Sequence, residues 1–284
     1  MTDEDVSAHG RDARDAAGSR TLADNLPAQA IMAEFLSAQD YAAPRSRLSR
    51  LFGVTPLTPE TKLLYQGVLG ELEVGSTLDS LGRGWIVLHA LPVAGGLDID
   101  HLAIGPSGVY IITTRNHAGE PVWASQRTLI VGDIRHPDIR NMEFEMGRVE
   151  RLLSTAAGRA IEVSGVLAVV SPKTLTVRQK HRDVEVLSSD RLAAWLMGRR
   201  RVLSPEEVEE VAAAAGHATT WHQDESAPLD SHDLRARFDR VRAQVTRAWR
   251  LQVGWAAFIT LVGAGSFFVV TYVILLSALG LLPR

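Results

Sequence analysis

Residues 97–119 read LDIDHLAIGPSGVYIITTRNHAG, and this stretch decides the fold. Two apolar runs, Ile99–Ile104 and Val109–Ile112, flank the sequence Gly105-Pro106-Ser107-Gly108. Proline fixes φ and glycine tolerates positive φ, so these four residues favour a turn. Runs rich in β-branched residues on either side of such a loop are typical of a β-hairpin. The stretch therefore predicts two antiparallel strands.

Polar residues gather at one end of this predicted hairpin. Side chains on a strand alternate between its two faces. Thr113 and Arg115 therefore share a face of the second strand, and Asp98 and Asp100 share a face of the first. Antiparallel pairing places the start of the first strand beside the end of the second, so we expect Asp100 near Thr113 and Arg115. An acid, a hydroxyl and a guanidinium together indicate a polar site rather than a core.

A longer pattern surrounds the hairpin and includes a G-x-x-G-E sequence on a predicted helix and a strand that contains a histidine. Its residues are Gly67, Gly70, Glu71, Val87, Leu88, His89, Asp98, Asp100, His101, Gly105, Gly108, Val109, Thr114, Asn116 and Gly119. In order and spacing they resemble the nuclease-related domain (NERD) family, itself similar to the PD-(D/E)xK nucleases, over roughly residues 62–200. The resemblance implies an α/β fold: an αβββα core with a mixed sheet flanked by helices.

The resemblance also implies a catalytic site. In the nucleases that the family resembles, a helical acid, a strand aspartate and an (E/D)-x-K pair hold one or two Mg²⁺ ions, which activate water and neutralise the phosphate. Carried over to this chain, the catalytic positions are Glu71, Asp100, Thr113 and Arg115. Glu71 and Asp100 are the expected metal ligands, and the Thr114 carbonyl is a further candidate.

Two of these positions depart from the nuclease pattern. Thr113 replaces the acid, and a neutral hydroxyl removes one negative charge from a site for a hard cation. Arg115 replaces the lysine, and arginine can hold a phosphate bidentately but does not deprotonate to act as a base. We therefore expect a degenerate site that binds Mg²⁺ or Mn²⁺ weakly, if at all.

The predicted function is binding of DNA, RNA or another phosphate ligand with weak or no cleavage. The expected substrate-binding residues are Arg115, Asn116, His117 and Arg140. Two alternatives stay open. The first is an active Mg²⁺-dependent nuclease in which Asp98 or Glu143 compensates for the missing acid. The second is a non-catalytic protein-interaction domain held at the membrane.

Hydrophobic periodicity and turn residues place the remaining elements. The expected helices are 28–36, 58–81, 138–157, 190–197 and 204–215, and the expected strands besides the hairpin are 84–91, 121–123, 128–131, 163–170 and 184–187. Asp138 is expected to cap its helix. His89 is expected to be a hydrogen-bonded core histidine, and packing rather than base stacking is the expected role of Trp123.

The C-terminal part of the sequence predicts a membrane span. Val253–Leu282 carries no charge, and about twenty residues suffice to cross a bilayer, so we expect one tilted helix. Six arginines precede it and only Arg284 follows, which predicts a single-pass protein of the cell membrane with its globular domain cytoplasmic. The basic amphipathic stem at 234–252 is expected to pair with a second copy or to lie on anionic lipid. Arg45–Phe52 is expected to form a short amphipathic helix or linker, and the alternative is a basic patch that touches the membrane.

Composition limits the remaining possibilities. Lys and Arg number 30 against 33 Asp and Glu, so the net charge of −3 provides no overall basic field for nucleic acid. Cysteine is absent, which excludes disulfides and cysteine-ligated zinc. The predicted divisions are 1–57 (tail and short helices), 58–215 (NERD-like domain), 216–233 (linker), 234–252 (stem) and 253–282 (transmembrane helix).

Overall fold

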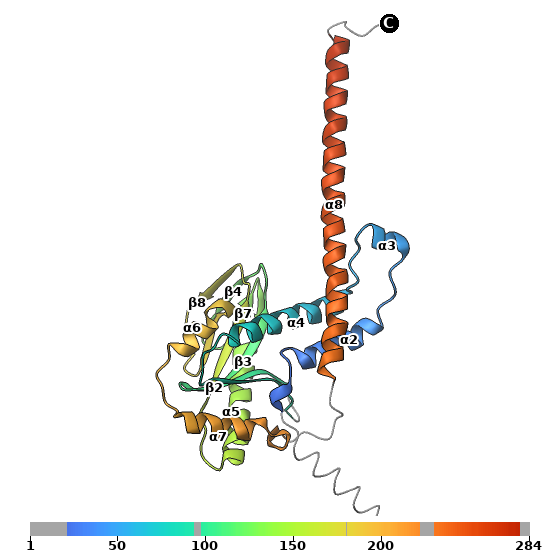
Figure 1. Cartoon of the computed structure of the whole chain (residues 1–284). Helices are drawn as coiled ribbons and strands as arrows, with labels where there is room; N and C mark the ends of the chain where they lie inside the picture. Colours follow the sequence, from blue (N-terminus) through green and yellow to red (C-terminus); the bar gives the residue numbers. More distant parts are fainter. Residues whose placement is uncertain (1–21, 94–97, 180, 222–229, 279–284) are drawn as a thin grey trace, which may run out of the picture. The chain divides into compact units, whose positions relative to one another are not determined.

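A computed structural model of the chain describes residues 22–93, 98–179, 181–221 and 230–278 (Figure 1). The chain divides into two compact units, residues 1–35 with 63–234 and residues 36–62 with 235–284. The predicted division 1–57, of tail and short helices, includes residues 1–21, and the last four residues of the predicted span are 279–282. Both of these segments lie outside the described residues.

The first unit is a mixed α/β structure, as the sequence predicts. Its helices are η1 (Leu22–Asp24), the first part of α2 (Gln29–Asp40), most of α4 (Pro59–Leu78), α5 (Asp138–Ala157), η2 (Ser189–Arg191), α6 (Leu192–Met197), α7 (Pro205–Gly216) and η3 (Ala218–Trp221). Its strands are β1 (Ile86–Leu91), β2 (Ile99–Gly105), β3 (Gly108–Asn116), β4 (Pro121–Ala124), β5 (Leu129–Val131), β6 (Ile134–His136), β7 (Val163–Val170), β8 (Thr174–Val177) and β9 (Val184–Ser188).

The main sheet has the strand order β1-β2-β3-β7-β9. The first three strands are antiparallel, whereas β7 and β9 continue parallel to β3. The predicted hairpin is β2–β3, with His101 opposite Ile112 and Gly105 opposite Gly108. Gly105 and Gly108 belong to the strands, so the turn consists of Pro106 and Ser107 alone. Helix α4 precedes β1, β2 and β3, and α5 follows them after the inserted strands β4, β5 and β6, so the predicted αβββα core is confirmed.

The two faces of this sheet bury different helices. Ile111 of β3 belongs to the core cluster that includes residues of α5 and α7. Its neighbours Tyr110 and Ile112 belong to a second cluster, with Val74 of α4 and Leu192 of α6. Successive residues of β3 thus face two different cores, as expected for a strand that is buried on both sides. Burial on both sides explains why β3 and β7 are apolar almost throughout.

A second, smaller sheet has the order β6-β5-β4-β8. The β4–β5 pair confirms the predicted hairpin, whereas the short strands β6 and β8 have no counterpart in the sequence prediction. Val122 and Leu129 face the core that this sheet shares with α5 and α7. Trp123 points the other way, is 39% exposed and lies under the Arg178 guanidinium, 4.8 Å from the ring centroid.

Two histidines meet inside the main sheet. His89 and His101 are cross-strand partners on β1 and β2, and their Nδ1 atoms are 2.8 Å apart. One Nδ1 must donate and the other accept, so at least one of the two rings is neutral. Burial lowers the pKa of both rings, that of His101 further because His89 lies beside it. The prediction that His89 is a hydrogen-bonded core histidine is confirmed.

The second unit contains α3 (Arg47–Leu51) and most of α8 (Ser231–Ala278). The predicted short helix within Arg45–Phe52 is therefore present. One continuous helix covers the stem and the described part of the span (Figure 1). Among the described residues, α8 alone is long and apolar enough to cross a membrane.

The β2–β3 turn provides a test of the packing. A Cβ at Gly105 would overlap the indole of Trp85, a rigid ring that cannot move aside without disturbing the core beside Tyr110. We expect Gly105→Ala to lower the free energy of unfolding by about 1–3 kcal/mol, the usual cost of overpacking. The matched control is Gly82→Ala, where a Cβ meets no atom within 4 Å. Thermal unfolding of the full chain in detergent measures both, and equal melting temperatures would contradict the expectation.

Candidate functional site

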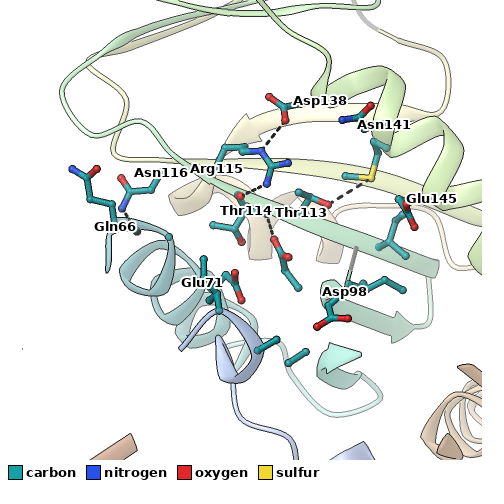
Figure 2. A pocket seen from close by; sticks show the side chains of 18 of the residues that line it. Gln66, Glu71, Asp98, Thr113, Thr114, Arg115, Asn116, Asp138, Asn141 and Glu145 are labelled. Atoms are coloured by element: carbon teal, nitrogen blue, oxygen red, sulfur yellow. Dashed lines mark hydrogen bonds and ion pairs between the residues drawn. The ribbon is translucent and has the colours of Figure 1, made fainter. Parts of the chain in front are cut away.

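A polar pocket of about 520 Å³ lies where β2 begins and β3 ends, between α4 and the first turns of α5 (Figure 2). The predicted site residues that line it are Glu71, Asp98, Asp100, Thr113, Arg115, Asn116 and His117. Two other predicted residues do not. Arg140 is exposed on α5, and Glu143 bonds the Nε2 of His181 at 2.7 Å. The hairpin thus brings together most of the residues that the sequence singles out.

Two glycines on α4 bring Glu71 to the hairpin. A Cβ at Gly70 would lie 3.1 Å from the Asn116 Cβ and 3.2 Å from the Thr114 Cγ2, so glycine permits close packing of α4 on β3. A Cβ at Gly67 would overlap Ile31 of α2. The G-x-x-G-E pattern therefore has a steric cause: Gly70 lets α4 and the acid that follows approach the sheet, and Gly67 lets α2 pack on α4.

Asp100 is bound to the backbone of the neighbouring strand. Its Oδ2 accepts a hydrogen bond from the Thr114 N–H at 2.7 Å. Loss of solvent raises the pKa of Asp100 to about 6, although the Thr114 bond and the Arg115 charge both act to lower that pKa. The predicted proximity of Asp100 to residues 113–115 is thereby confirmed.

Glu71 and Asp98 both interact electrostatically with the Asp100 carboxyl group or with each other. Burial raises the pKa of Glu71 well above its ordinary value, and the negative charges of Asp100 and Asp98 add to that rise. Burial also raises the pKa of Asp98, which lies at the exposed side of the pocket. These carboxyl groups repel one another, so the site favours retained protons or a bound cation.

Arg115 is held by Asp138, the acid that the sequence predicts to cap α5. Its Nε donates to Asp138 Oδ1 at 2.8 Å and its Nη1 donates to the Thr114 carbonyl at 2.9 Å (Figure 2). The prediction that Asp138 caps α5 is wrong, because Pro137 occupies the cap position and makes no side-chain cap bond. Asp138 is buried and extends toward Arg115 instead. No local signal in the sequence links two residues that lie 23 positions apart.

The remaining predicted residues have structural partners. Asn116 donates through Nδ2 to the Gln66 carbonyl at 2.7 Å, which ties β3 to α4. Thr113 directs its hydroxyl at the Met142 sulfur, 4.0 Å away. Burial lowers the pKa of His117, and the nearby His136 lowers it further. Among the described residues, the His117 Nε2 is buried without a hydrogen-bond partner.

Acidic side chains outnumber cationic ones in the lining of the pocket. Six acids line it against Arg115: Glu34, Glu71, Asp98, Asp100, Asp138 and Glu145. The mutual repulsion of Glu71 and Asp100 fits a divalent cation, and carboxylate oxygens are the ligands that Mg²⁺ and Mn²⁺ prefer. Their number fits less well, because no three His, Asp or Glu side chains among the described residues are grouped to hold a metal ion.

An αβββα core with acids from the helix and the first hairpin strand defines a nuclease-like α/β domain. Residues 66–170, from the middle of α4 to the end of β7, match the family described as nuclease-related domain (NERD). This part of the chain is therefore similar to a nuclease-related domain. No curated protein and no solved structure matches the chain.

The raised pKa of Asp100 makes stability depend on pH. The native state favours the protonated carboxyl group of Asp100. The stabilisation from this proton is complete below the unfolded pKa near 4, and it is lost as the pH rises through the native pKa of about 6. The rise from 3.8 to about 6 corresponds to at most about 3 kcal/mol, since the residue is partly exposed. We expect Asp100→Asn to remove this loss.

Denaturation of the full chain in detergent at pH 4.5 and pH 7 measures the difference. Asp133→Asn, at an exposed turn between β5 and β6, is the matched control and should retain the parental slope. If Asp100→Asn also retains that slope, the carboxyl is not desolvated in the way that the geometry requires.

Proposed function

We propose that this chain is a membrane-anchored protein whose nuclease-related domain binds the phosphodiester backbone of DNA or RNA through a divalent cation, with weak or no cleavage. The observation that carries the proposal is the meeting of Glu71 and Asp100 at one end of the hairpin, with Arg115 beside them. The family match supports a nuclease-related role.

The charge of the pocket supports a requirement for a cation. A phosphodiester is an anion, and six acids against one arginine repel it unless the acids are neutralised. Glu71 and Asp100 are the residues that would hold Mg²⁺ or Mn²⁺. When bound, such an ion neutralises phosphate charge and lowers the pKa of its water. The Nη2 of Arg115 has no hydrogen-bond partner among the described residues and is available to a phosphate oxygen.

Two features argue for poor cleavage. Thr113 contributes a neutral hydroxyl where a carboxylate would add charge to the cation site, and that hydroxyl points at Met142. Arg115 cannot deprotonate, so it cannot take a proton from an attacking water. Its guanidinium is also balanced by Asp138 at 2.8 Å. Arg115 can therefore position a phosphate, but it cannot act as a general base.

One observation favours an active nuclease as the second candidate. Asp98 lines the same pocket, and its charge acts on both Glu71 and Asp100. A third carboxylate supplied by Asp98 would restore the charge that Thr113 removes. Mg²⁺-dependent cleavage is the property that separates the two candidates.

We expect the full chain in detergent to bind fluorescent single-stranded DNA, duplex DNA or RNA with Mg²⁺ or Mn²⁺, and to release it when EDTA is added. Asp100→Asn should weaken binding by about tenfold or more, because it removes one charge from the cation site. Asp133→Asn is the matched control. The double change Thr113→Glu with Arg115→Lys should raise the affinity for Mn²⁺.

Other outcomes have definite meanings. Cleavage that Asp100→Asn abolishes would establish the active nuclease. Absence of binding at low salt, with or without metal, would overturn the proposal and favour a protein-interaction domain. A double variant with unchanged affinity for Mn²⁺ would show that residues 113 and 115 do not face the cation.

We further propose that α8 anchors the chain in the cell membrane as a single span, with the globular unit cytoplasmic. The arginine-rich stem before the span supports that orientation. We expect the full chain to stay in the membrane pellet after an alkaline carbonate wash. Val269→Arg with Val270→Arg should release it, since a charge at the middle of a span costs about 2.5–3.5 kcal/mol. Ser277→Arg near the end of the helix is the control, and release of the unmodified chain would contradict the anchor.

A further inference from the structure

The second unit contains a pocket whose charge is opposite to that of the candidate site. It has a volume of about 610 Å³ and lies between α3 and the stem part of α8. Arg45, Arg47, Arg50 and Arg247 line it, together with Gln244 and Leu251. We call these four arginines and the space between them the arginine pocket. No acid lines it among the described residues.

Hydrogen bonds hold the arginine pocket in shape. Arg45 donates through Nη1 to the Val54 carbonyl at 2.8 Å and through Nη2 to Gln244 Oε1 at 2.9 Å. These bonds link the segment around α3 to α8. Ser46 caps α3 by accepting from the Ser49 N–H at 3.1 Å. The arginines therefore stand on a defined turn.

Gly53 brings this turn against the stem. Its φ is +73°, and a Cβ there would lie 2.5 Å from the Ala248 carbonyl oxygen, so only glycine fits. Ala248 follows Arg247 directly, which fixes the stem arginine beside those of α3. The pocket is thus built by backbone contact as well as by side-chain contact.

None of the four arginines of the pocket forms an ion pair with another described residue. Asp239, which lines a further pocket with Arg247, pairs with Arg235 at 3.2 Å. Burial lowers the pKa of Arg45, and repulsion from Arg50 lowers it further. The nearby acid Asp40 is engaged by Arg237 at 2.7 Å. Guanidinium groups bind phosphate through planar, paired hydrogen bonds, so a cluster of four is suited to a phosphate-bearing anion.

Apolar residues show at which level of a membrane the pocket would lie. Arg247 precedes Val253, the first residue of the apolar stretch, by about 9 Å of helix rise, which is comparable to the depth of a headgroup layer. Trp255 Nε1 donates to the Leu51 carbonyl at 3.0 Å, and its ring lies 5.3 Å from that of Phe52. Leu48 and Phe52 are 67% and 51% exposed. Aromatic and apolar side chains with arginines behind them are typical of the membrane interface.

We propose that the arginine pocket binds the phosphate of an anionic phospholipid headgroup while Leu48 and Phe52 enter the acyl-chain boundary. This inference rests on the proposed membrane anchor. It makes α3 a second membrane contact. The anionic lipid then binds at a specific site beside the span and is not attracted only by the overall charge of the stem.

The test uses the full chain in neutral detergent, titrated with phosphatidylglycerol or phosphatidylcholine and examined by native mass spectrometry. We expect phosphatidylglycerol to bind and phosphatidylcholine to bind at least about tenfold more weakly. The triple variant Arg47→Gln, Arg50→Gln, Arg247→Gln should lose about tenfold or more in affinity for phosphatidylglycerol. Arg45 is left in place because it holds the turn to α8.

The matched control is Arg199→Gln, Arg200→Gln, Arg201→Gln, three exposed arginines of the first unit whose loss changes the net charge equally. It should bind phosphatidylglycerol as the parent does. An equal loss in both triple variants would mean net charge alone attracts the lipid and would overturn the pocket. Inorganic phosphate that competes at the same concentration as the lipid would assign a soluble anion instead and would also overturn the proposal.

Folding and anchoring are controlled separately. The melting temperature of each variant shows whether it is folded, and Arg47→Gln alone is the milder variant if the triple variant unfolds. A chain that resists carbonate extraction but does not distinguish the two lipids overturns this inference and leaves the anchor intact. A chain that carbonate releases overturns the anchor itself.

Discussion

The Asp100 carboxylate accepts the Thr114 N–H at the point where β2 begins and β3 continues beyond it. The geometry of the site depends on this one bond. It joins the two hairpin strands where their polar residues lie, and it fixes the orientation of a half-buried carboxyl group. Gly70 lets α4 approach the same strand, so Glu71 meets Asp100 in a common field. The raised pKa of both groups is the electrostatic cost of that arrangement.

Charge is segregated along this chain in a way that its net value hides. The net charge is −3, yet the candidate site gathers six acids around one arginine, and the arginine pocket gathers four arginines without an acid among the described residues. In the acidic pocket Asp138 pairs with Arg115 and Glu145 with Arg148, whereas Glu71, Asp98 and Asp100 form no ion pair with a described residue. We therefore assign a cation to the acidic pocket and a phosphate group to the basic one.

Local patterns predicted the hairpin, the helices at 138–157 and 204–215, and the buried strands, because each has its own periodicity or turn residues. They also predicted that Asp100 would meet residues 113–115, since antiparallel pairing follows from a tight turn. They missed β6 and β8, which are three and four residues long and acquire their strand character from neighbours. Arg140 does not line the pocket, although it lies only two residues beyond Asp138 on the same helix.

The sequence by itself determined the αβββα order, the acidic and hydroxyl residues at the end of the hairpin, and an uncharged segment long enough to span a bilayer. Those features follow from spacing along the chain, which fixes strand faces, helix faces and lengths. Only the tertiary structure decided that Asp138 serves Arg115 rather than its own helix, and that arginines from α3 and α8 converge. Such pairings join residues from 23 to about 200 positions apart, and no local periodicity encodes which side chains meet across that distance.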